Sequence, residues 1–177
     1  MKSRFQRRIL RRCPGIGMSS YLCCLARAQP KSVTLEVAPN GRYLQRSDGV
    51  PFFVQSDTAW TLSRDYSREE VAKYLESRRA LKFNTIQMSA VFFVTPAMEA
   101  QIGEAFTDGD FAKPVATHRD KVDWTVREAT RPGFVVALNP IWGNQRKKPI
   151  KKNGVEKCRD LGRRLARRCR DNPGARD

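Results

Sequence analysis

The sequence of 177 residues lacks the features that define several large protein classes. It has no run of 18 or more apolar residues, which excludes a transmembrane helix. It has no sustained repeat, which excludes solenoids, coiled coils and collagen-like chains. No glycine-rich phosphate-binding motif follows a predicted strand, which argues against a nucleotide-binding Rossmann fold or a P-loop. The chain has one histidine, so a zinc site is not expected, and we predict neither a metal nor a cofactor.

Cysteine is scarce outside the first 28 residues. Cys13, Cys23 and Cys24 lie within that segment, which leaves Cys158 and Cys169 in the rest of the chain. These two are eleven residues apart in a predicted helix, so their Cα atoms would be about 16 Å apart along its axis. That separation is beyond the reach of a disulfide, and we predict none between them.

The net charge of +16 comes from the two ends of the chain. Residues 1–28 contain seven basic and no acidic residues, and residues 145–177 contain thirteen basic and four acidic residues. Residues 29–144 contain fourteen of each and are neutral overall. A basic binding face on a folded domain would not divide its charge in this way, so each end needs its own explanation.

The N-terminal segment has the order of an export signal. A positive stretch from Lys2 to Arg12 precedes a weakly apolar stretch, Cys13 to Ala26, and Ala26-Arg27-Ala28 supplies a small-x-small cleavage pattern. We interpret residues 1–28 as a signal peptide or basic leader, which predicts a secreted or periplasmic protein. A disordered basic tail, or upstream sequence translated from a misplaced start codon, is the alternative.

The remaining chain predicts a β-hairpin followed by alternating strands and helices. The expected strands cover residues 33–37, 42–45, 51–55, 85–94 and 134–138. The expected helices run from a capping box at Ser67 and Glu70 to Lys82, from His118 to Ala129, and from a second capping box at Asn153 and Glu156 to Arg170. We expect Val71, Tyr74, Leu75 and Leu81 to face the core from the first helix, and Val155, Cys158, Leu161, Leu165 and Cys169 to do so from the last. Such alternation predicts parallel strands in an open α/β sheet or a TIM barrel.

Four polar or aromatic residues fall where a β/α barrel places its functional groups, at the carboxyl ends of strands. Asp57 and Trp60 follow the first expected buried strand, Gln87 lies within the next, and Trp142 follows the last. Tryptophan faces stack on sugar C–H surfaces while carboxylates and amides bind hydroxyls, so these four residues predict a sugar site. Each has an alternative interpretation: Asp57 as a turn cap, Gln87 as a satisfied buried amide, and the tryptophans as core residues.

The chain resembles the apiosidase-like glycoside hydrolases over roughly residues 33–173. The stretches that carry the resemblance are Leu35-Glu36-Val37, Pro39-Asn40-Gly41-Arg42-Tyr43-Leu44, Asp48-Gly49-Val50-Pro51-Phe52-Phe53, Ser56-Asp57-Thr58-Ala59-Trp60, Ser67-Arg68-Glu69-Glu70, Lys82-Phe83-Asn84-Thr85-Ile86-Gln87, Val122-Asp123-Trp124, Leu138-Asn139-Pro140-Ile141-Trp142-Gly143 and Asp171-Asn172-Pro173. The resemblance implies an α/β fold of the (β/α)8 TIM-barrel type and a carbohydrate substrate of the pectic, apiose-type class.

The resemblance also implies glycosidic hydrolysis by two carboxylic acids. In the family these acids are expected later in the barrel, after the fourth strand and near the seventh. This sequence carries the hairpin and about three βα units, so we expect an incomplete barrel and assign no catalytic residue. The expected fragment binds sugar and has little or no hydrolase activity.

Two other groups of charged residues suggest competing functions. Glu104, Asp108 and Asp110 lie in a long loop over residues 95–117, which is either solvated or borders a cleft. Residues 146–170 are rich in lysine and arginine. They predict a solvated helix face or, as the alternative function, a non-catalytic module that binds nucleic acid or another polyanion. No aromatic residues interleave with these charges, so no specific nucleic acid is expected as a partner.

Overall fold

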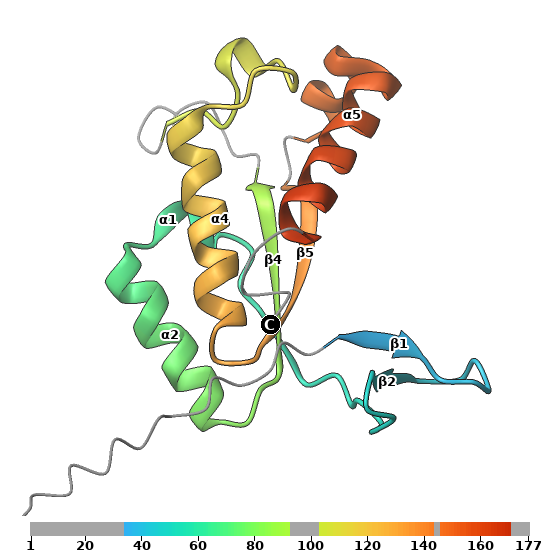
Figure 1. Ribbon diagram of the computed structural model, residues 1–177. Coiled ribbons are helices and arrows are strands. Elements are labelled where there is room, and N and C mark those ends of the chain that lie inside the picture. Colours follow the sequence, from blue (N-terminus) through green and yellow to red (C-terminus); the bar gives the residue numbers. More distant parts are fainter. Residues whose placement is uncertain (1–33, 93–102, 144–145, 171–177) are drawn as a thin grey trace, which may run out of the picture.

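The computed structural model describes residues 34–92, 103–143 and 146–170, and two separate sheets organise them (Figure 1). Strands β1 (Leu35–Val37) and β2 (Leu44–Arg46) form an antiparallel hairpin. Strands β3 (Ser56–Thr58), β4 (Thr85–Phe92) and β5 (Val135–Trp142) form a parallel sheet in the order β3-β4-β5. The helices are α1 (Leu62–Asp65), α2 (Arg68–Ala80), α4 (Ala116–Thr130) and α5 (Lys147–Arg170), with a short 3-10 turn η1 (Thr107–Gly109). The predicted mixed α/β class with parallel strands is therefore confirmed.

One face of the parallel sheet packs against helices. Ile86 of β4 is fully buried in a cluster with Val71 and Leu75 of α2. Met88, two residues further along β4, is buried against Val122 and Val126 of α4. Because side chains alternate along a strand, Gln87 and Ser89 belong to the opposite face of β4. Figure 1 shows α1, α2 and α4 grouped beside β4, with the hairpin projecting away from them.

A separate apolar cluster lies where β4 and β5 end. Val91 of β4 and Leu161 of α5 pack there with Phe106 and Phe111, both from the loop that precedes α4. The ring of Phe111 is completely buried and lies 4.9 Å from that of Phe106, centroid to centroid. This loop is therefore attached to the body of the protein over its described residues.

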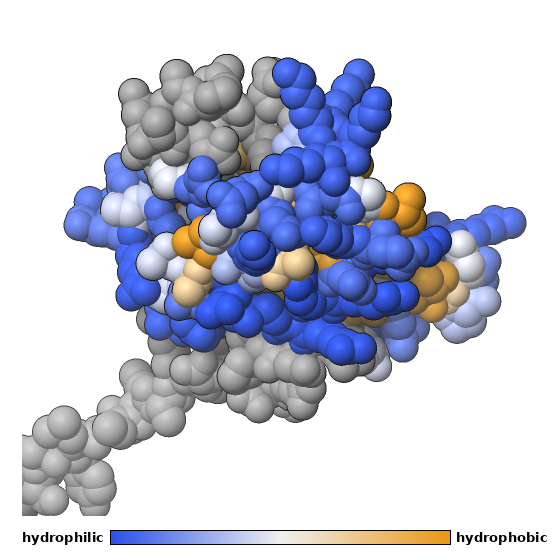
Figure 2. Space-filling model, turned by 90° about the horizontal axis from the view of Figure 1, so that it is seen from above, coloured by the Kyte–Doolittle hydropathy of each residue, from blue (hydrophilic) through white to orange (hydrophobic). Residues whose placement is uncertain are grey.

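The hairpin carries an exposed apolar surface. Val37, Tyr43, Leu44 and Val50 are all more than a third exposed, and Phe53 is 82% exposed. Figure 2 shows hydrophobic atoms on the side of the molecule where the hairpin extends, whereas hydrophilic side chains dominate the rest of that face.

The expected third strand over residues 51–55 is wrong. Pro51 forms only an isolated antiparallel bridge with Gln45, because proline has no N–H to continue a ladder. The first parallel strand instead begins at Ser56. Side-chain hydrogen bonds from Asn84 fix the segment before it: Asn84 Oδ1 accepts from Gln55 N at 2.9 Å and Nδ2 donates to Phe53 O at 2.7 Å.

One predicted capping box is confirmed and the other is wrong. Ser67 caps α2 as expected, and both reciprocal bonds with Glu70 are present. Helix α5 begins at Lys147, but Gly154, with φ 69° and ψ 178°, divides it into two helical segments. The second segment starts within two residues of the predicted start at Asn153, and the first was not predicted. Asn153 bonds to a neighbouring loop and does not cap this helix.

Two residues expected to face the core do not. Leu81 is 57% exposed because α2 ends at Ala80, and Val155 is 65% exposed just after the break at Gly154. Strand β5 also extends further than predicted and includes Asn139 and Trp142. Cys158 and Cys169 are both free thiols, which confirms that they do not pair.

Within the residues that the structure describes, no helix combines the length and apolar character needed to cross a bilayer. The predicted leader, residues 1–28, lies outside the described residues, as does Val94 at the end of the expected strand.

Candidate functional site

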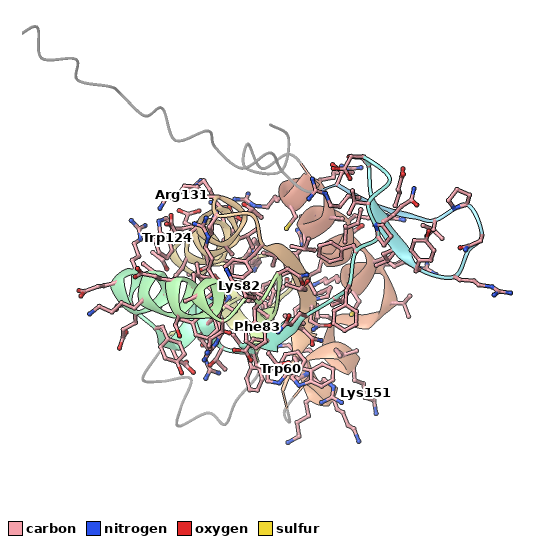
Figure 3. The ribbon with its side chains drawn as sticks, turned by 90° about the horizontal axis from the view of Figure 1, so that it is seen from below. Trp60, Lys82, Phe83, Trp124, Arg131 and Lys151 are labelled. Carbon is pink, nitrogen blue, oxygen red and sulfur yellow. The ribbon has the colours of Figure 1, made fainter. Side chains whose placement is uncertain are left out.

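Two of the four predicted site residues meet at the carboxyl ends of the parallel strands. Trp60 follows β3 and Trp142 ends β5, and their rings stack at 4.8 Å between centroids with an interplanar angle of 5°. Since β3 and β5 lie on either side of β4, this pair connects the two outer strands of the sheet. Figure 3 labels Trp60 and Lys151 on the same side of the molecule, away from Trp124 and Arg131.

A guanidinium group packs against the aromatic pair. The Arg146 side chain lies over the Trp142 ring, with Cζ 5.1 Å from the centroid. Its Nη1 donates to Gly143 O at 2.7 Å. Gly143 has φ 107°, a value that favours glycine and turns the chain as it leaves β5. Trp142 nevertheless remains 39% exposed, so solvent reaches the pair from its side.

Polar side chains lie on the face of the sheet opposite α2 and α4. Gln87 pairs in register with Thr58 of β3 and Ala137 of β5, and Ser89 pairs with Asn139. Ser89 N donates to Trp60 O at 3.2 Å, which places the backbone of this serine next to that of Trp60. The hydroxyl of Ser89 is buried, the residue being only 2% exposed, and has no hydrogen-bond partner within the described part of the chain.

Sequence reasoning missed Ser89. It lies in an apolar, β-branched run that we interpreted as a packing strand, and a single serine there gives no signal by itself. The only available indication was the two-residue spacing from Gln87, which assigns both side chains to one face of the strand.

Asp57 does not join the other three predicted residues. Its Oδ2 accepts from the Tyr74 hydroxyl at 3.0 Å, and it forms an ion pair with Arg78, so its carboxylate faces α2. Its register partner is Ile86, which packs in the same helix-facing cluster. Asp57 therefore connects β3 to α2, and the turn-cap alternative accounts only for its 2.8 Å bond from Thr58 N.

The contact between Tyr74 and Asp57 changes the pKa of the tyrosine. Burial, followed by the hydrogen bond to Asp57, raises the pKa of Tyr74 to about 12. The Arg78 guanidinium stacks over the Tyr74 ring at 4.9 Å and opposes part of that increase. The cluster consists of a carboxylate, a phenol and a guanidinium that use one another as partners.

The histidine also has a structural partner. His118 Nε2 lies 2.9 Å from Ala90 O, near the end of β4. Burial lowers its pKa, since an imidazolium would lose hydration there.

The loop carboxylates do not converge on the aromatic pair. Glu104 and Asp108 are exposed. Asp110 forms an ion pair with Lys157 at 2.8 Å, and this lysine, together with the Ala112 N–H, lowers the pKa of the Asp110 carboxyl. No group of three or more His, Cys, Asp or Glu side chains within the described ranges is arranged to hold a metal ion.

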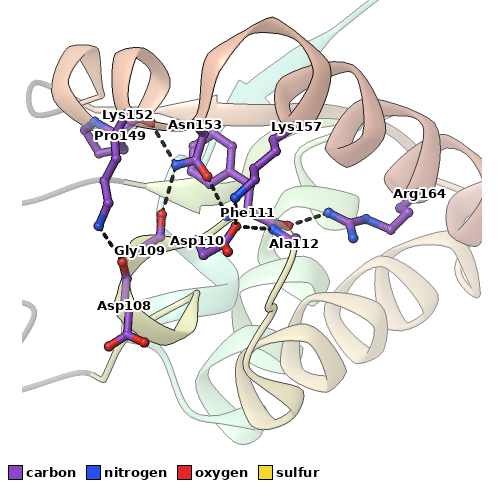
Figure 4. A network of polar contacts seen from close by, with 10 residues as sticks. All are labelled: Asp108, Gly109, Asp110, Phe111, Ala112, Pro149, Lys152, Asn153, Lys157 and Arg164. Carbon is purple, nitrogen blue, oxygen red and sulfur yellow. Dashed lines mark hydrogen bonds and ion pairs between the residues drawn. The ribbon is translucent and has the colours of Figure 1, made fainter.

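Helix α5 fixes this loop by a set of polar contacts (Figure 4). Asn153 Oδ1 accepts from Phe111 N, and its Nδ2 donates to Gly109 O and to Pro149 O, each at 2.9 Å. Lys152 donates to Asp108 O at 2.7 Å, and Arg164 donates to Phe111 O. Several basic residues of α5 therefore position a loop of the protein itself.

Solved structures that resemble the chain are glycoside hydrolases. One is described as "Glycoside hydrolase"; it is 30% identical, with a TM-score of 0.65, and the match covers 80% of this chain and 32% of that protein. Another is a glycoside hydrolase family 5 protein from Bacteroides vulgatus ATCC 8482, 28% identical with the same TM-score, with 79% and 31% covered. The chain thus spans about a third of the length of each. No curated protein matches it.

A match to a family sequence model identifies the family of the chain. A sequence model described as "Apiosidase-like, catalytic domain" matches residues 38–175. The chain belongs to this apiosidase-like family, which confirms the resemblance carried by the sequence motifs.

Proposed function

We propose that the chain provides the sugar-binding part of a glycoside hydrolase catalytic domain that acts on pectic, apiose-type glycans. The observation that carries the proposal is the Trp60–Trp142 pair, at the carboxyl ends of parallel strands in a chain of glycoside hydrolase ancestry. Indole faces stack on sugar C–H surfaces, and functional groups of β/α barrels gather at this end of the strands. Gln87, on the face opposite α2 and α4, supplies an amide for sugar hydroxyls.

The proposed fold is the first part of a TIM barrel. The hairpin, the three parallel strands and the match to about a third of two glycoside hydrolases support it. The match to the family's catalytic domain is also the support for proposing a carbohydrate substrate.

We further propose that this chain alone has little or no hydrolase activity. Glycosidic hydrolysis needs two carboxyl groups facing each other across the scissile bond. Among the described residues, Asp57 faces α2 and Asp110 is paired with Lys157, so neither is available for that role.

Binding to apiose-bearing pectic fragments tests the function. Purified chain should bind these fragments in isothermal titration calorimetry, and Trp142→Ala should weaken binding about tenfold because a stacking face is lost. Tyr43→Ala is the matched control, since Tyr43 is a similarly exposed aromatic side chain on the hairpin. Equal loss in both variants, or no binding by the wild type, would contradict the proposal. Release of sugar by the wild type would contradict only the proposed inactivity.

A polyanion-binding function is the second candidate, favoured by the charge of α5. This helix contains eleven basic and two acidic residues. Lys147, Lys148 and Lys151 are exposed, and no ion pair links them to an acidic side chain in the described part of the protein. Under this alternative, generic DNA binding should persist at about 200 mM salt and fall in a triple Lys→Gln variant at these positions. Glycan binding unaffected by the triple variant, with no such DNA binding, would favour the sugar site.

A further inference from the structure

The indole rings of Trp60 and Trp142 cover each other's faces. A sugar stacks on the flat face of an indole ring, yet the facing surfaces of Trp60 and Trp142 already cover each other at 4.8 Å and 5°. Arg146 also lies over Trp142. No sugar ring fits between two indoles at this separation, so their facing surfaces are closed to a ligand.

Ser89, whose backbone bonds to that of Trp60, has a buried hydroxyl without a partner among the described residues. Ser89 is 2% exposed and its Oγ has no hydrogen-bond partner within the described residues. Buried polar groups are normally satisfied, and one that is not needs a physical explanation. The serine is joined to the pair through its backbone, because Ser89 N donates to Trp60 O.

Other hydrogen-bonding groups accompany this hydroxyl. Asn139 is the register partner of Ser89 on β5, and Gln87 lies two residues earlier on the same face of β4. Both amides are partly exposed. A hydroxyl and two amides beside aromatic rings form the combination that binds a sugar, with polar groups for its hydroxyls and aromatic faces for its C–H surfaces.

We propose that the Trp60–Trp142 stack is the closed form of the sugar site, and that an entering sugar ring separates the indoles and hydrogen-bonds to Ser89. This inference rests on the proposed sugar-binding function and adds a binding residue and a conformational step to it. Trp142 is the ring that moves. It is 39% exposed and ends its strand before the turn at Gly143, whereas Trp60 is less exposed to solvent.

Circular dichroism of the full chain tests the opening step. Two stacked indoles whose transition dipoles are skewed relative to each other give an exciton couplet in the far ultraviolet, which Trp60→Phe and Trp142→Phe should abolish. Trp124→Phe should retain it, because Trp124 lies on α4 against Arg68. Saturating apiose-bearing pectic fragments should reduce the couplet by at least half. Binding detected by calorimetry with an unchanged couplet would overturn the opening step and leave the proposed function intact. No binding at all would overturn both.

Ser89→Ala tests the hydroxyl. We expect binding of the fragments to weaken roughly tenfold, the loss expected for one hydrogen bond between buried groups. We expect no loss of folding stability, since the hydroxyl has no partner among the described residues. Ser77→Ala, on the exposed side of α2, should change neither quantity. Unchanged binding in Ser89→Ala, or a loss that matches a loss of stability, would show that the serine only fills space.

Discussion

Replacement of Asn153 by alanine should release the loop before α4 from α5. The variant removes the acceptor of the Phe111 N–H, in a residue that is completely buried. Loss of an acceptor by a buried donor costs about 1–3 kcal/mol. The bonds to Gly109 O and Pro149 O are also lost, but both residues are partly exposed, so water replaces much of their contribution. We expect a total loss of about 2 kcal/mol.

Hydrogen exchange at the Phe111 amide measures this effect directly. A loss of about 2 kcal/mol corresponds to roughly 30-fold faster exchange if the loop opens locally, and urea denaturation would detect any global loss. Asn40→Ala is the matched control, because the side chain of Asn40 accepts from Arg42 N in an exposed turn, at 3.1 Å. Its free energy of unfolding should change by less than about 0.5 kcal/mol. Unchanged exchange at Phe111 in Asn153→Ala would refute the reasoning, because Asn153 would then not hold the loop.

Three further predictions concern stability and pH. Ser67→Ala should lower the free energy of unfolding by about 1 kcal/mol through loss of the capping box. Ser77→Ala within the same helix should change this free energy little. Urea denaturation compares the two variants, and equal effects would contradict the capping argument. The pKa of the Tyr74 phenol is raised to about 12, so its contribution to stability is present below about pH 10 and is lost as the pH rises toward 12. Ultraviolet titration should find a lower pKa for Tyr74 in the Asp57→Asn variant. Burial lowers the pKa of the His118 imidazole, so its contribution to stability is present above about pH 6.5 and is lost as the pH falls below that value. Because His118 is the single histidine, its NMR titration is unambiguous. A titration midpoint at or above about pH 6.5 would contradict the effect of burial.

Local signals in the sequence determined the order of elements and the family. The capping box of Ser67 and Glu70 and the apolar strand that begins at Thr85 depend on near neighbours in the sequence, which residue type and periodicity encode. The alternation of strands and helices predicted parallel pairing. The first parallel strand was misplaced because its three residues are polar and mostly exposed, so they carry no apolar pattern. The segment of α5 before Gly154 was not predicted, because it is rich in lysine and lacks an acidic first turn, whereas the segment after Gly154 begins close to the predicted start.

Only the tertiary structure decided how the candidate site is arranged. Trp60 and Trp142 are far apart in the sequence and meet because their strands flank β4. The sequence placed Asp57 at the right end of a strand, but the side of the sheet that it faces depends on the register, which directs its carboxylate to α2. The unpartnered hydroxyl of Ser89 likewise has no local signal, because the satisfaction of a buried polar group depends on every element that surrounds it. Composition and periodicity thus determined which elements form, and long-range packing determined which side chains meet.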